Sequence, residues 1–251
     1  MRLRERVTEE PELRHDNPLL VQWEFASEER LDKRNSIYRE LIEGDNAEDV
    51  LFAAVAECAP KRVLDVGCGI GETSERVARD LGASVVAVDS SPRMVHLTRE
   101  RGIDARLGDI QALELDDESF DCVIAGWVLY HVIEREQAIL ECRRVLRRGG
   151  RLVAATLASN NLAELWELLG ADTERHFTFS AENGQAQLEP HFERVERRDA
   201  HGRVVFPTPD AMRSYVAANI TRAHLAARVP HFTEPVSAST FHTVFVAEKS
   251  A

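Results

Sequence analysis

The chain has 251 residues, a length that suits one large domain with or without a small addition. It carries 31 Lys and Arg against 43 Asp and Glu, so its formal net charge is −12. That balance disfavours a protein that holds nucleic acid or an anionic membrane surface through a basic face. Hydrophobic residues make up 44% of the chain, which is enough for a packed core and too many for a disordered protein.

The sequence shows neither a membrane span nor a secretion signal. No stretch approaches the roughly 20 apolar residues that cross a bilayer. Residues 1–12 alternate in charge and lack the apolar core of a signal peptide. We therefore expect a cytoplasmic protein.

Neither the cysteines nor the histidines have the spacing of metal ligands. The cysteines include no C-x-x-C pair, so we predict reduced, mostly buried thiols at Cys58, Cys68, Cys122 and Cys142. The histidines include no H-x-x-x-H or H-E-x-x-H pair, so we predict no metal site. Since polar side chains usually lie at the surface, we expect most of the imidazoles to be exposed.

Residues 1–59 have the pattern of amphipathic helices, with apolar residues spaced among Glu, Arg and Lys. Helices are predicted over Leu13 to Trp23, Glu28 to Ile42 and Asn46 to Cys58, and Pro60 ends the third. We expect this segment to form an N-terminal helical lid.

Residues 60–158 alternate between short apolar strands and helices. Strands are predicted over 62–67, 83–89, 104–107, 120–126 and 151–156, with helices over 72–81, 91–101 and 134–146. The last of these strands follows a turn at Gly149-Gly150, and helix caps are expected at Ser90 or Ser91 and, later in the chain, near Thr208. Such alternation implies right-handed crossovers and a parallel sheet covered on both faces. The sequence therefore predicts an α/β fold, with a doubly wound, mostly parallel, Rossmann-like sheet as the cofactor-binding core.

Residues 159–251 are expected to complete the sheet and to add substrate-pocket helices. We predict a helix over Leu162 to Leu169, strands over 192–198 and 203–206 separated by a turn at His201-Gly202, a continuous or broken helix over Asp210 to Val229, and a final strand over 240–247. Aromatic residues recur in this third and suit either an apolar substrate pocket or core packing: Trp166, Phe177, Phe179, Phe206, Tyr215, Phe232 and Phe241.

A glycine-rich run, D-V-G-C-G-I-G at residues 65–71, joins the first strand of the core to its helix. Glycines let the backbone turn sharply and let a ligand approach closely. A dinucleotide site would follow G-x-G-x-x-G, but here Glu72 stands at the third glycine's place. A carboxylate at the helix N-terminus serves a pyrophosphate poorly. The run therefore favours a ligand with a nucleoside but no phosphates.

Acidic residues stand at the ends of three successive strands of the core. Asp65 lies in the first, Asp89 ends the second, and Asp109 follows the third. Each alone also fits a solvated loop residue or a helix cap. Because ligands of such sheets bind beyond the carboxyl ends of the strands, the three together indicate a nucleoside site. There Asp89 would accept the ribose hydroxyls, and Asp109 the exocyclic amine of adenine.

Five segments carry a pattern that goes beyond single residues. They are V-L-D-V-G-C-G-I-G at 63–71, V-A-V-D-S-S-P-R-M at 86–94, G-D-I-Q-A-L at 108–113, F-D-C-V-I-A-G-W-V-L-Y-H at 120–131 and R-V-L-R-R-G-G-R-L at 144–152. In this order they resemble the motifs of class I S-adenosylmethionine-dependent methyltransferases, nearest to small-molecule enzymes of the menaquinone/ubiquinone type and their natural-product relatives. The resemblance covers residues 61–156 and implies a seven-stranded sheet and S-adenosyl-L-methionine as the cofactor.

The resemblance also implies roles for single residues. Gly67 and Gly69 would pass beneath the methionine part of the cofactor, and Asp65 would order its ammonium group. Asp89 and Asp109 would keep the ribose and adenine contacts already assigned to them.

The adenine would lie between Met94 and Ile110. Gly126 and Trp127 would face the sulfonium, at a place where many relatives have Ser or Asn, so an unusual substrate side is expected. The other residues expected at the cofactor are Cys68, Ser90 and Gly108.

Four further residues are assigned to the lid and the acceptor. Arg34 and Tyr38 would close over the methionine carboxylate, although a solvated Arg and a half-buried Tyr fit the sequence as well. Tyr130 and His131 follow the fourth strand and are the candidates for substrate contact and proton transfer, with a hydrogen bond from His131 to a loop carbonyl as the alternative.

The favoured hypothesis is a methyltransferase that acts on a small, apolar or aromatic molecule. It would work as a monomer or homodimer and would contact no nucleic acid or membrane. Methylation of RNA or protein is one alternative, which the net charge disfavours for RNA, although Arg143, Arg144, Arg147 and Arg148 form a basic cluster. A non-catalytic, cofactor-binding regulatory subunit is the other, and the intact glycines and acids disfavour it.

Overall fold

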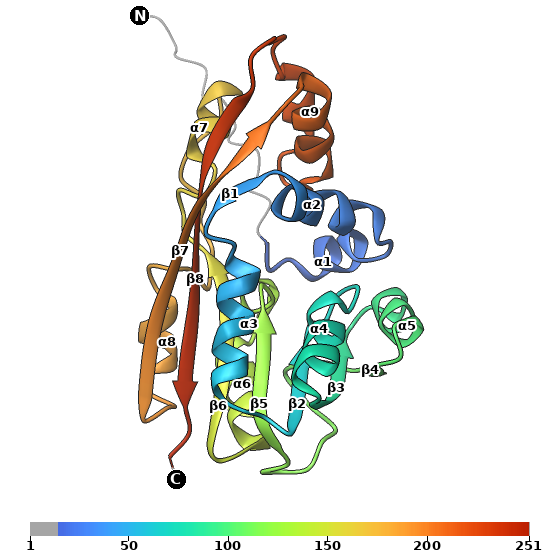
Figure 1. Ribbon diagram of the computed structural model, residues 1–251, viewed down its shortest axis with the longest axis vertical. Helices are drawn as coiled ribbons and strands as arrows, with labels where there is room; N and C mark the ends of the chain where they lie inside the picture. The colour runs from blue at the N-terminus through green and yellow to red at the C-terminus, as the bar shows by residue number, and fades with distance from the viewer. Residues whose placement is uncertain (1–14, 251) are drawn as a thin grey trace, which may run out of the picture.

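A single sheet of eight strands, in the order β1-β7-β8-β6-β5-β2-β3-β4, organises the computed structural model, which describes residues 15–250 (Figure 1). Its strands are β1 (Ile42–Gly44), β2 (Arg62–Val66), β3 (Ser84–Asp89), β4 (Asp104–Leu107), β5 (Phe120–Gly126), β6 (Leu146–Leu157), β7 (Arg194–Phe206) and β8 (Val236–Glu248). Strands β2 to β6 pair in parallel. Beyond β6, the neighbours β8, β7 and β1 each pair antiparallel with the strand before them in the sheet. The predicted doubly wound, mostly parallel sheet is confirmed.

Nine α-helices surround the sheet within the described residues. They are α1 (Pro18–Glu24), α2 (Glu29–Glu40), α3 (Ala47–Glu57), α4 (Glu72–Leu81), α5 (Pro92–Glu100), α6 (Arg135–Val145), α7 (Ala163–Leu168), α8 (Gly184–Leu188) and α9 (Pro209–Ala218). The predicted caps are present, because the side chain of Ser91 accepts from the Met94 amide and that of Thr208 from the Ala211 amide. None of the helices over residues 15–250 is long and apolar enough to cross a membrane.

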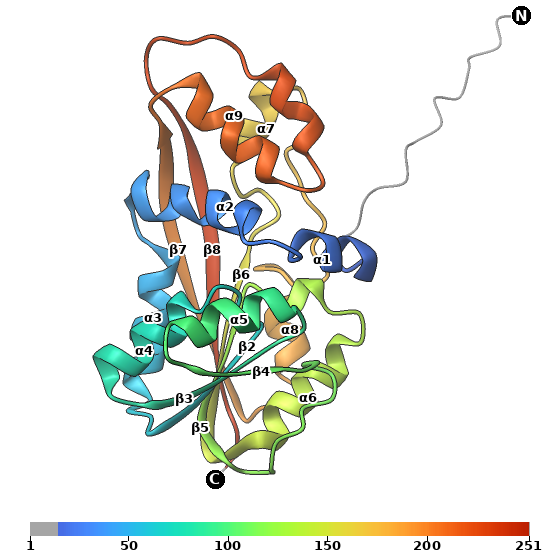
Figure 2. The same cartoon turned by 90° about the vertical axis from the view of Figure 1, so that its right-hand side faces the viewer.

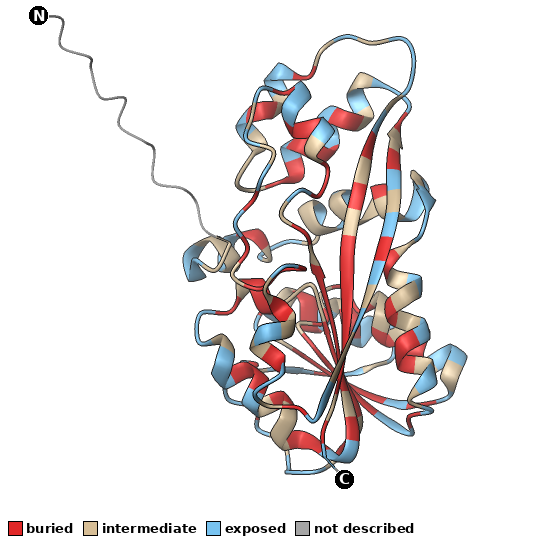
Figure 3. Cartoon of the chain, turned by 90° about the vertical axis from the view of Figure 1, so that its left-hand side faces the viewer, coloured by how far each residue is buried: buried red, intermediate tan, exposed pale blue. Residues whose placement is uncertain are grey.

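Two apolar layers cover the two faces of the parallel strands. Helices α3 and α4 pack on one face through Leu51, Val55 and Val77, and α6 packs on the other through Ile139 and Cys142. Figure 3 shows the buried residues along the central strands and on the inner sides of these helices. All four cysteines are free thiols.

A third core lies where β7 and β8 extend beyond the parallel strands. Helices α2, α7 and α9 gather around that extension (Figure 2). Trp166 and Phe206 are fully buried within this core, and Phe179 is fully buried between the sheet and α8. Core packing is therefore their role, and the pocket lining considered for them in the sequence was wrong.

Part of the predicted N-terminal lid belongs to the sheet. Helix α2 ends at Glu40, two residues before the predicted end at Ile42, and β1 follows at once and pairs with β7, so the sheet has eight strands and not seven. Only α1 and α2 remain as candidates for a lid, and its boundary stays a prediction. The start of the first predicted helix, at Leu13, lies outside the described residues.

Two expectations about turns were wrong, and the helix expected over Asp210 to Val229, whether continuous or broken, is broken. It ends at Ala218, and a 3-10 helix follows at Ala223–Arg228. Gly149-Gly150 lies inside β6 instead of forming a turn before it. His201-Gly202 lies inside the continuous strand β7.

Close packing of backbones explains why glycine stands at position 202. A Cβ at this position would lie 2.7 Å from the carbonyl oxygen of Asp45 and 2.9 Å from that of Glu43. Glycine in a strand often marks such a close approach of another backbone, which here is that of β1. Because glycine is also common in turns, its presence at this position led to the prediction of a turn.

We expect Gly202→Ala to destabilise the fold by about 1–3 kcal/mol, because the new methyl group must displace backbone atoms of β1. Chemical denaturation would measure the change. Arg203→Ala is the matched control, since its ion pair with Glu43 is exposed on both sides and its loss should cost less than about 1 kcal/mol. Equal stability of Gly202→Ala and the unsubstituted protein would contradict this account.

Candidate functional site

A cavity of about 1030 Å³ opens at the carboxyl ends of the parallel strands, beneath α1 and α2. All of the site residues predicted from the sequence line it except Met94, which is fully buried behind it. Its volume is at the upper end of the range for a site that holds one small ligand, which leaves room for two molecules.

The glycine-rich loop forms one wall. Gly67 and Gly69 have φ values of +67° and +54°, in the left-handed region that favours glycine. A Cβ on Gly67 would lie 2.4 Å from the Val128 side chain, so the loop also needs glycine for packing. At the start of α4, Glu72 forms an ion pair of 2.8 Å with Arg39. The helix N-terminus therefore already carries a carboxylate and suits a phosphate poorly.

Two carboxylates lie beside this loop, that of Asp65 buried and that of Asp89 half-buried. Asp89 accepts the Gly69 amide at 2.9 Å and the Ser91 amide at 2.8 Å, and Asp65 accepts the Ser74 hydroxyl at 2.6 Å. Burial raises the pKa of Asp89, and it raises the pKa of Asp65 to about 7. Within residues 15–250 neither carboxylate has a Lys or Arg partner, so both suit a cationic or hydroxyl-bearing ligand.

Asp109 completes the acidic end. Its carboxylate accepts the Gln111 amide at 2.9 Å and the Gln111 side chain at 3.0 Å. The two neighbouring residues, Gly108 and Ile110, also line the cavity. The ends of β2, β3 and β4 thus bring their three acids to one side of a single cavity.

Contacts between distant segments hold α1 and α2 over this end. The hydroxyl of Ser91 donates to the carbonyl of Phe25 at 2.6 Å, and Arg93 donates to both carboxylate oxygens of Glu28. Arg34, on α2, forms an ion pair with Glu24 of α1. Arg34 is therefore a half-buried cation paired with Glu24 and not the solvated residue that the sequence left open.

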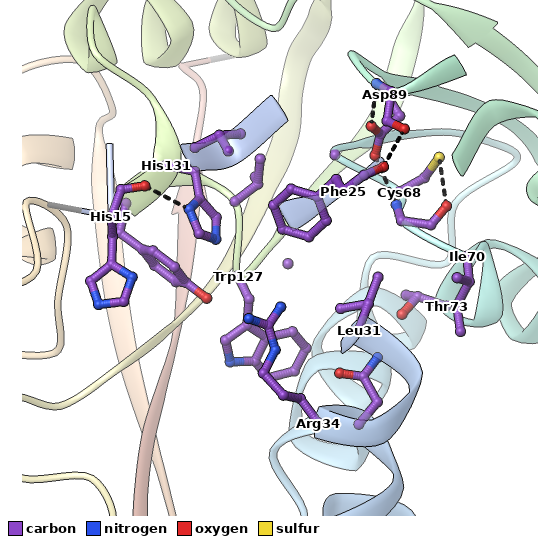
Figure 4. A pocket seen from close by; sticks show the side chains of 18 of the residues that line it. His15, Phe25, Leu31, Arg34, Cys68, Ile70, Thr73, Asp89, Trp127 and His131 are labelled. Atoms are coloured by element: carbon purple, nitrogen blue, oxygen red, sulfur yellow. Dashed lines mark hydrogen bonds between the residues drawn. The ribbon is translucent and has the colours of Figure 1, made fainter. Parts of the chain in front are cut away.

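The other end of the cavity begins at the turn after β5. Figure 4 shows Asp89 and Cys68 on one side, His15 and His131 on the other, and Trp127 and Arg34 between them. Trp127 has a φ of +54°, which is unusual for a bulky residue and marks a constrained position. Tyr130 and Phe177 are buried, and their ring centroids are 5.3 Å apart.

His131 has a defined tautomer. Its Nδ1 lies 2.9 Å from the backbone carbonyl oxygen of His15, and a carbonyl can only accept, so Nδ1 carries the hydrogen. Its Nε2 then has a free lone pair at the cavity. Burial lowers the pKa of His131 to about 4, which keeps the ring neutral near pH 7.

His242 has the opposite tautomer. Trp127 Nε1–H donates to Nδ1 of His242 at 3.1 Å, so the hydrogen of this ring is on Nε2. That atom is buried without a hydrogen-bond partner among the described residues. Burial also lowers the pKa of His242 to about 4. The expectation of exposed imidazoles was wrong for this residue, which lines the cavity and offers a donor.

The sequence analysis missed three residues that shape this end: His15, Arg175 and His242. A local signal for them is lacking, because each belongs to a segment outside the motifs. Among the predicted aromatics, Phe177 and Tyr215 do line the cavity. Tyr38, predicted as a lid residue, is half-buried there, and its ring centroid lies 5.2 Å from that of His242.

Comparisons with known proteins agree with this geometry. Residues 64–154 match the family model described as a methyltransferase domain. The chain is 37% identical over 117 residues to a ubiquinone biosynthesis O-methyltransferase from Methylocella silvestris, covering 44% of this chain and 45% of that protein. It is 35% identical over 156 residues to a malonyl-[acyl-carrier protein] O-methyltransferase from Pseudescherichia vulneris, covering 57% and 62%. The chain thus spans less than two thirds of the length of either relative.

The fold extends beyond the matched segment. The solved structure of the [4+2]-cyclase SpnF has a TM-score of 0.62 at 20% identity and covers 92% of this chain and 96% of that one. Since that protein is described as a cyclase, the fold alone does not define a reaction. The likeness to a methyltransferase domain rests on residues 64–154 and on the acids and glycines that they carry. In this segment the chain is similar to class I S-adenosylmethionine-dependent methyltransferases.

Proposed function

We propose that this chain transfers a methyl group from S-adenosylmethionine to a small, apolar or aromatic molecule. The observation that carries the proposal is one cavity with two unlike ends. Three acids and a glycine loop form the first end, and aromatic rings with an unprotonated imidazole nitrogen form the second. Two ligands can therefore meet in one enclosed space.

The acidic end fits the cofactor. Asp65 is buried and Asp89 is half-buried, and neither has a basic partner within residues 15–250. A ligand with an ammonium group and a ribose supplies the cation and the hydroxyl donors that they lack. Asp109 and Ile110 would hold the adenine. Met94 lies behind the cavity surface, so it would support the ring only through its neighbours.

The lid residues would hold the amino-acid end of the cofactor. Arg34 and Tyr38 line the cavity on α2. Because Glu24 balances the charge of Arg34, this residue would contribute hydrogen bonds to the cofactor carboxylate and no net charge. When bound, S-adenosylmethionine supplies a methyl group on a positively charged sulfur, which an acceptor atom displaces in line. The chain itself supplies proximity, alignment and exclusion of water.

His131 would accept the proton that a hydroxyl nucleophile must lose. Its Nδ1–H is held by the His15 carbonyl, which leaves Nε2 free toward the cavity. Tyr130 lies next to it with a ring-centroid separation of 4.4 Å and would orient the acceptor. A neutral imidazole with a fixed tautomer is ready to act as a general base.

Nucleic acid is disfavoured as the acceptor by the ion pairs of the basic cluster. Arg144 pairs with Glu141 and Asp117, and Arg147 pairs with Asp121. These guanidinium groups are already neutralised by the chain's own acids and offer little charge to phosphates.

Incubation with labelled S-adenosylmethionine and fractionated extracts tests the function directly. We expect label in small molecules that partition into organic solvent. Label found only in protein or RNA would contradict the proposal, and binding without any turnover would favour a regulatory subunit.

Asp89→Asn is expected to weaken S-adenosylhomocysteine binding by roughly 10- to 100-fold, because a charged acceptor for the ribose hydroxyls is lost. Titration calorimetry would measure the affinity. Asp104→Asn is the control, since this exposed aspartate pairs with Arg106 at the start of β4 and should leave binding unchanged. Equal affinities of the two variants would argue against ribose binding by Asp89.

The pKa of Asp65, about 7, predicts two opposite pH effects. In the unliganded protein the buried carboxyl favours the fold when protonated, so this stabilisation is present below pH 4 and is lost as pH rises toward 7. Cofactor binding should strengthen over the upper part of that range, because the ammonium group needs the carboxylate. Melting curves and calorimetry between pH 5 and 8 would show both trends, and Asp65→Asn should flatten them. Unchanged slopes in the variant would assign them to another group.

His131→Gln should lower kcat by about 100-fold or more at saturating cofactor while S-adenosylhomocysteine affinity stays unchanged, because only the base is removed. Steady-state kinetics with the acceptor found above would measure the loss. His96→Gln, an exposed histidine of α5, is the control. Full activity of His131→Gln would contradict the proposal that His131 is the base.

A further inference from the structure

Arg175 is a buried cation for which the described residues supply no counter-ion. It lies between α7 and α8, is 8% exposed and lines the cavity. Its Nη2 donates to Nε2 of His15 at 2.9 Å, and the guanidinium lies 4.7 Å from the ring centroid of Phe177. Within residues 15–250 no Asp or Glu forms an ion pair with it. Most of its five N–H donors are therefore available to the cavity.

Among the described residues, the groups around Arg175 leave its positive charge unbalanced. The groups that favour its charged form are the hydroxyls of Tyr38, Tyr130 and Tyr215, which are neutral near pH 7. Arg34, a half-buried cation that also lines the cavity, is neutralised by Glu24. A buried charge without a partner is costly, and such groups are retained where a ligand completes them.

We propose, resting on the methyltransferase function above, that the acceptor carries a carboxylate and that Arg175 binds it. A guanidinium and a carboxylate match in geometry, because two parallel N–H groups meet two oxygens. One uncompensated positive charge matches a monoanion, whereas a phosphate monoester would bring nearly two negative charges.

Neighbouring groups complete this subsite. His242 presents an unpartnered Nε2–H, a second donor toward an oxygen of the acceptor. Tyr130 and Phe177 supply aromatic surface. His15 connects Arg175 to the proposed base, because its ring accepts from Arg175 and its carbonyl accepts from His131. These groups describe a hydroxylated aromatic carboxylate, with the acid on Arg175 and the reacting hydroxyl at His131.

The carboxylate of the cofactor is the competing occupant, and the arrangement disfavours it. Arg175 is bonded to His15, and Figure 4 shows His15 and His131 on the opposite side of Trp127 and Arg34 from Asp89 and Cys68. The acid end and the Arg175 end are thus the two separate ends of the cavity.

The test compares binding of matched probes to the full chain loaded with S-adenosylhomocysteine. The probes are mono- and dihydroxybenzoates and hydroxycinnamates, each beside its primary amide, measured by titration calorimetry. We expect the best carboxylate to bind at least 10-fold more tightly than its amide. Arg175→Gln should abolish that preference, and Arg175→Lys should keep part of it, since the charge remains but the fork is lost.

Arg213→Gln is the matched control, because this exposed arginine of α9 pairs with Asp210 away from the cavity. It should keep the full preference. Arg175→Gln should also have a melting temperature equal to or above that of the unsubstituted protein, since a buried, unpaired charge is removed. If Arg175 served only to stabilise the fold, the melting temperature of Arg175→Gln would be lower than that of the unsubstituted protein.

Several results would overturn the inference. They are the absence of a carboxylate preference across the panel, its persistence in Arg175→Gln, or a lowered melting temperature with the preference intact. An equal loss of S-adenosylhomocysteine affinity in Arg175→Gln would assign the guanidinium to the cofactor instead. Failure of the unsubstituted chain to bind S-adenosylhomocysteine would contradict the proposed function alone, because the probe comparison can be repeated on the unliganded protein.

Discussion

The site depends on the parallel pairing of β2, β3 and β4. Because right-handed crossovers keep these strands parallel, their carboxyl ends meet at one edge, and the residue that ends or follows each strand faces the same space. Asp65, Asp89 and Asp109 come together for this reason alone. Asp65 is buried by the same pairing, since the sheet is covered on both faces by α3, α4 and α6, whereas Asp89 is half-buried and Asp109 is exposed at the edge strand.

The cavity holds unbalanced charge at both ends. Among the described residues, Asp65 and Asp89 have no basic partner at one end, and Arg175 has no acidic partner at the other. These groups are too far apart in the fold to form ion pairs with one another, so each keeps the cost of its own desolvation. Ligands of complementary charge recover that cost, which links the binding preference of each end to the stability of the unliganded protein.

The extension of β7 and β8 decides what covers the cavity. By running beyond the parallel strands, this hairpin carries the core formed with α2, α7 and α9 and holds α2 above the glycine loop. Gly202 permits β1 to pair there, and β1 leads directly from α2 to α3. The lid is thereby attached to the sheet and not only to the cofactor end.

The sequence alone determined the parallel core, the glycine loop and the three strand-end acids. These features depend on spacing within a few dozen residues, where strand, turn and helix follow one another in a fixed order. It could not identify Gly202 as a packing glycine, because the carbonyls that exclude a Cβ belong to residues 43 and 45.

Only the tertiary structure decided the acceptor end. The bond between His15 and Arg175 joins residues 160 positions apart, that between His15 and His131 joins residues 116 apart, and that between Trp127 and His242 joins residues 115 apart. The spacing of apolar residues along the sequence does not reveal such contacts. The tautomers of both histidines and the missing partner of Arg175 follow from them, because protonation and charge balance depend on which groups meet in space.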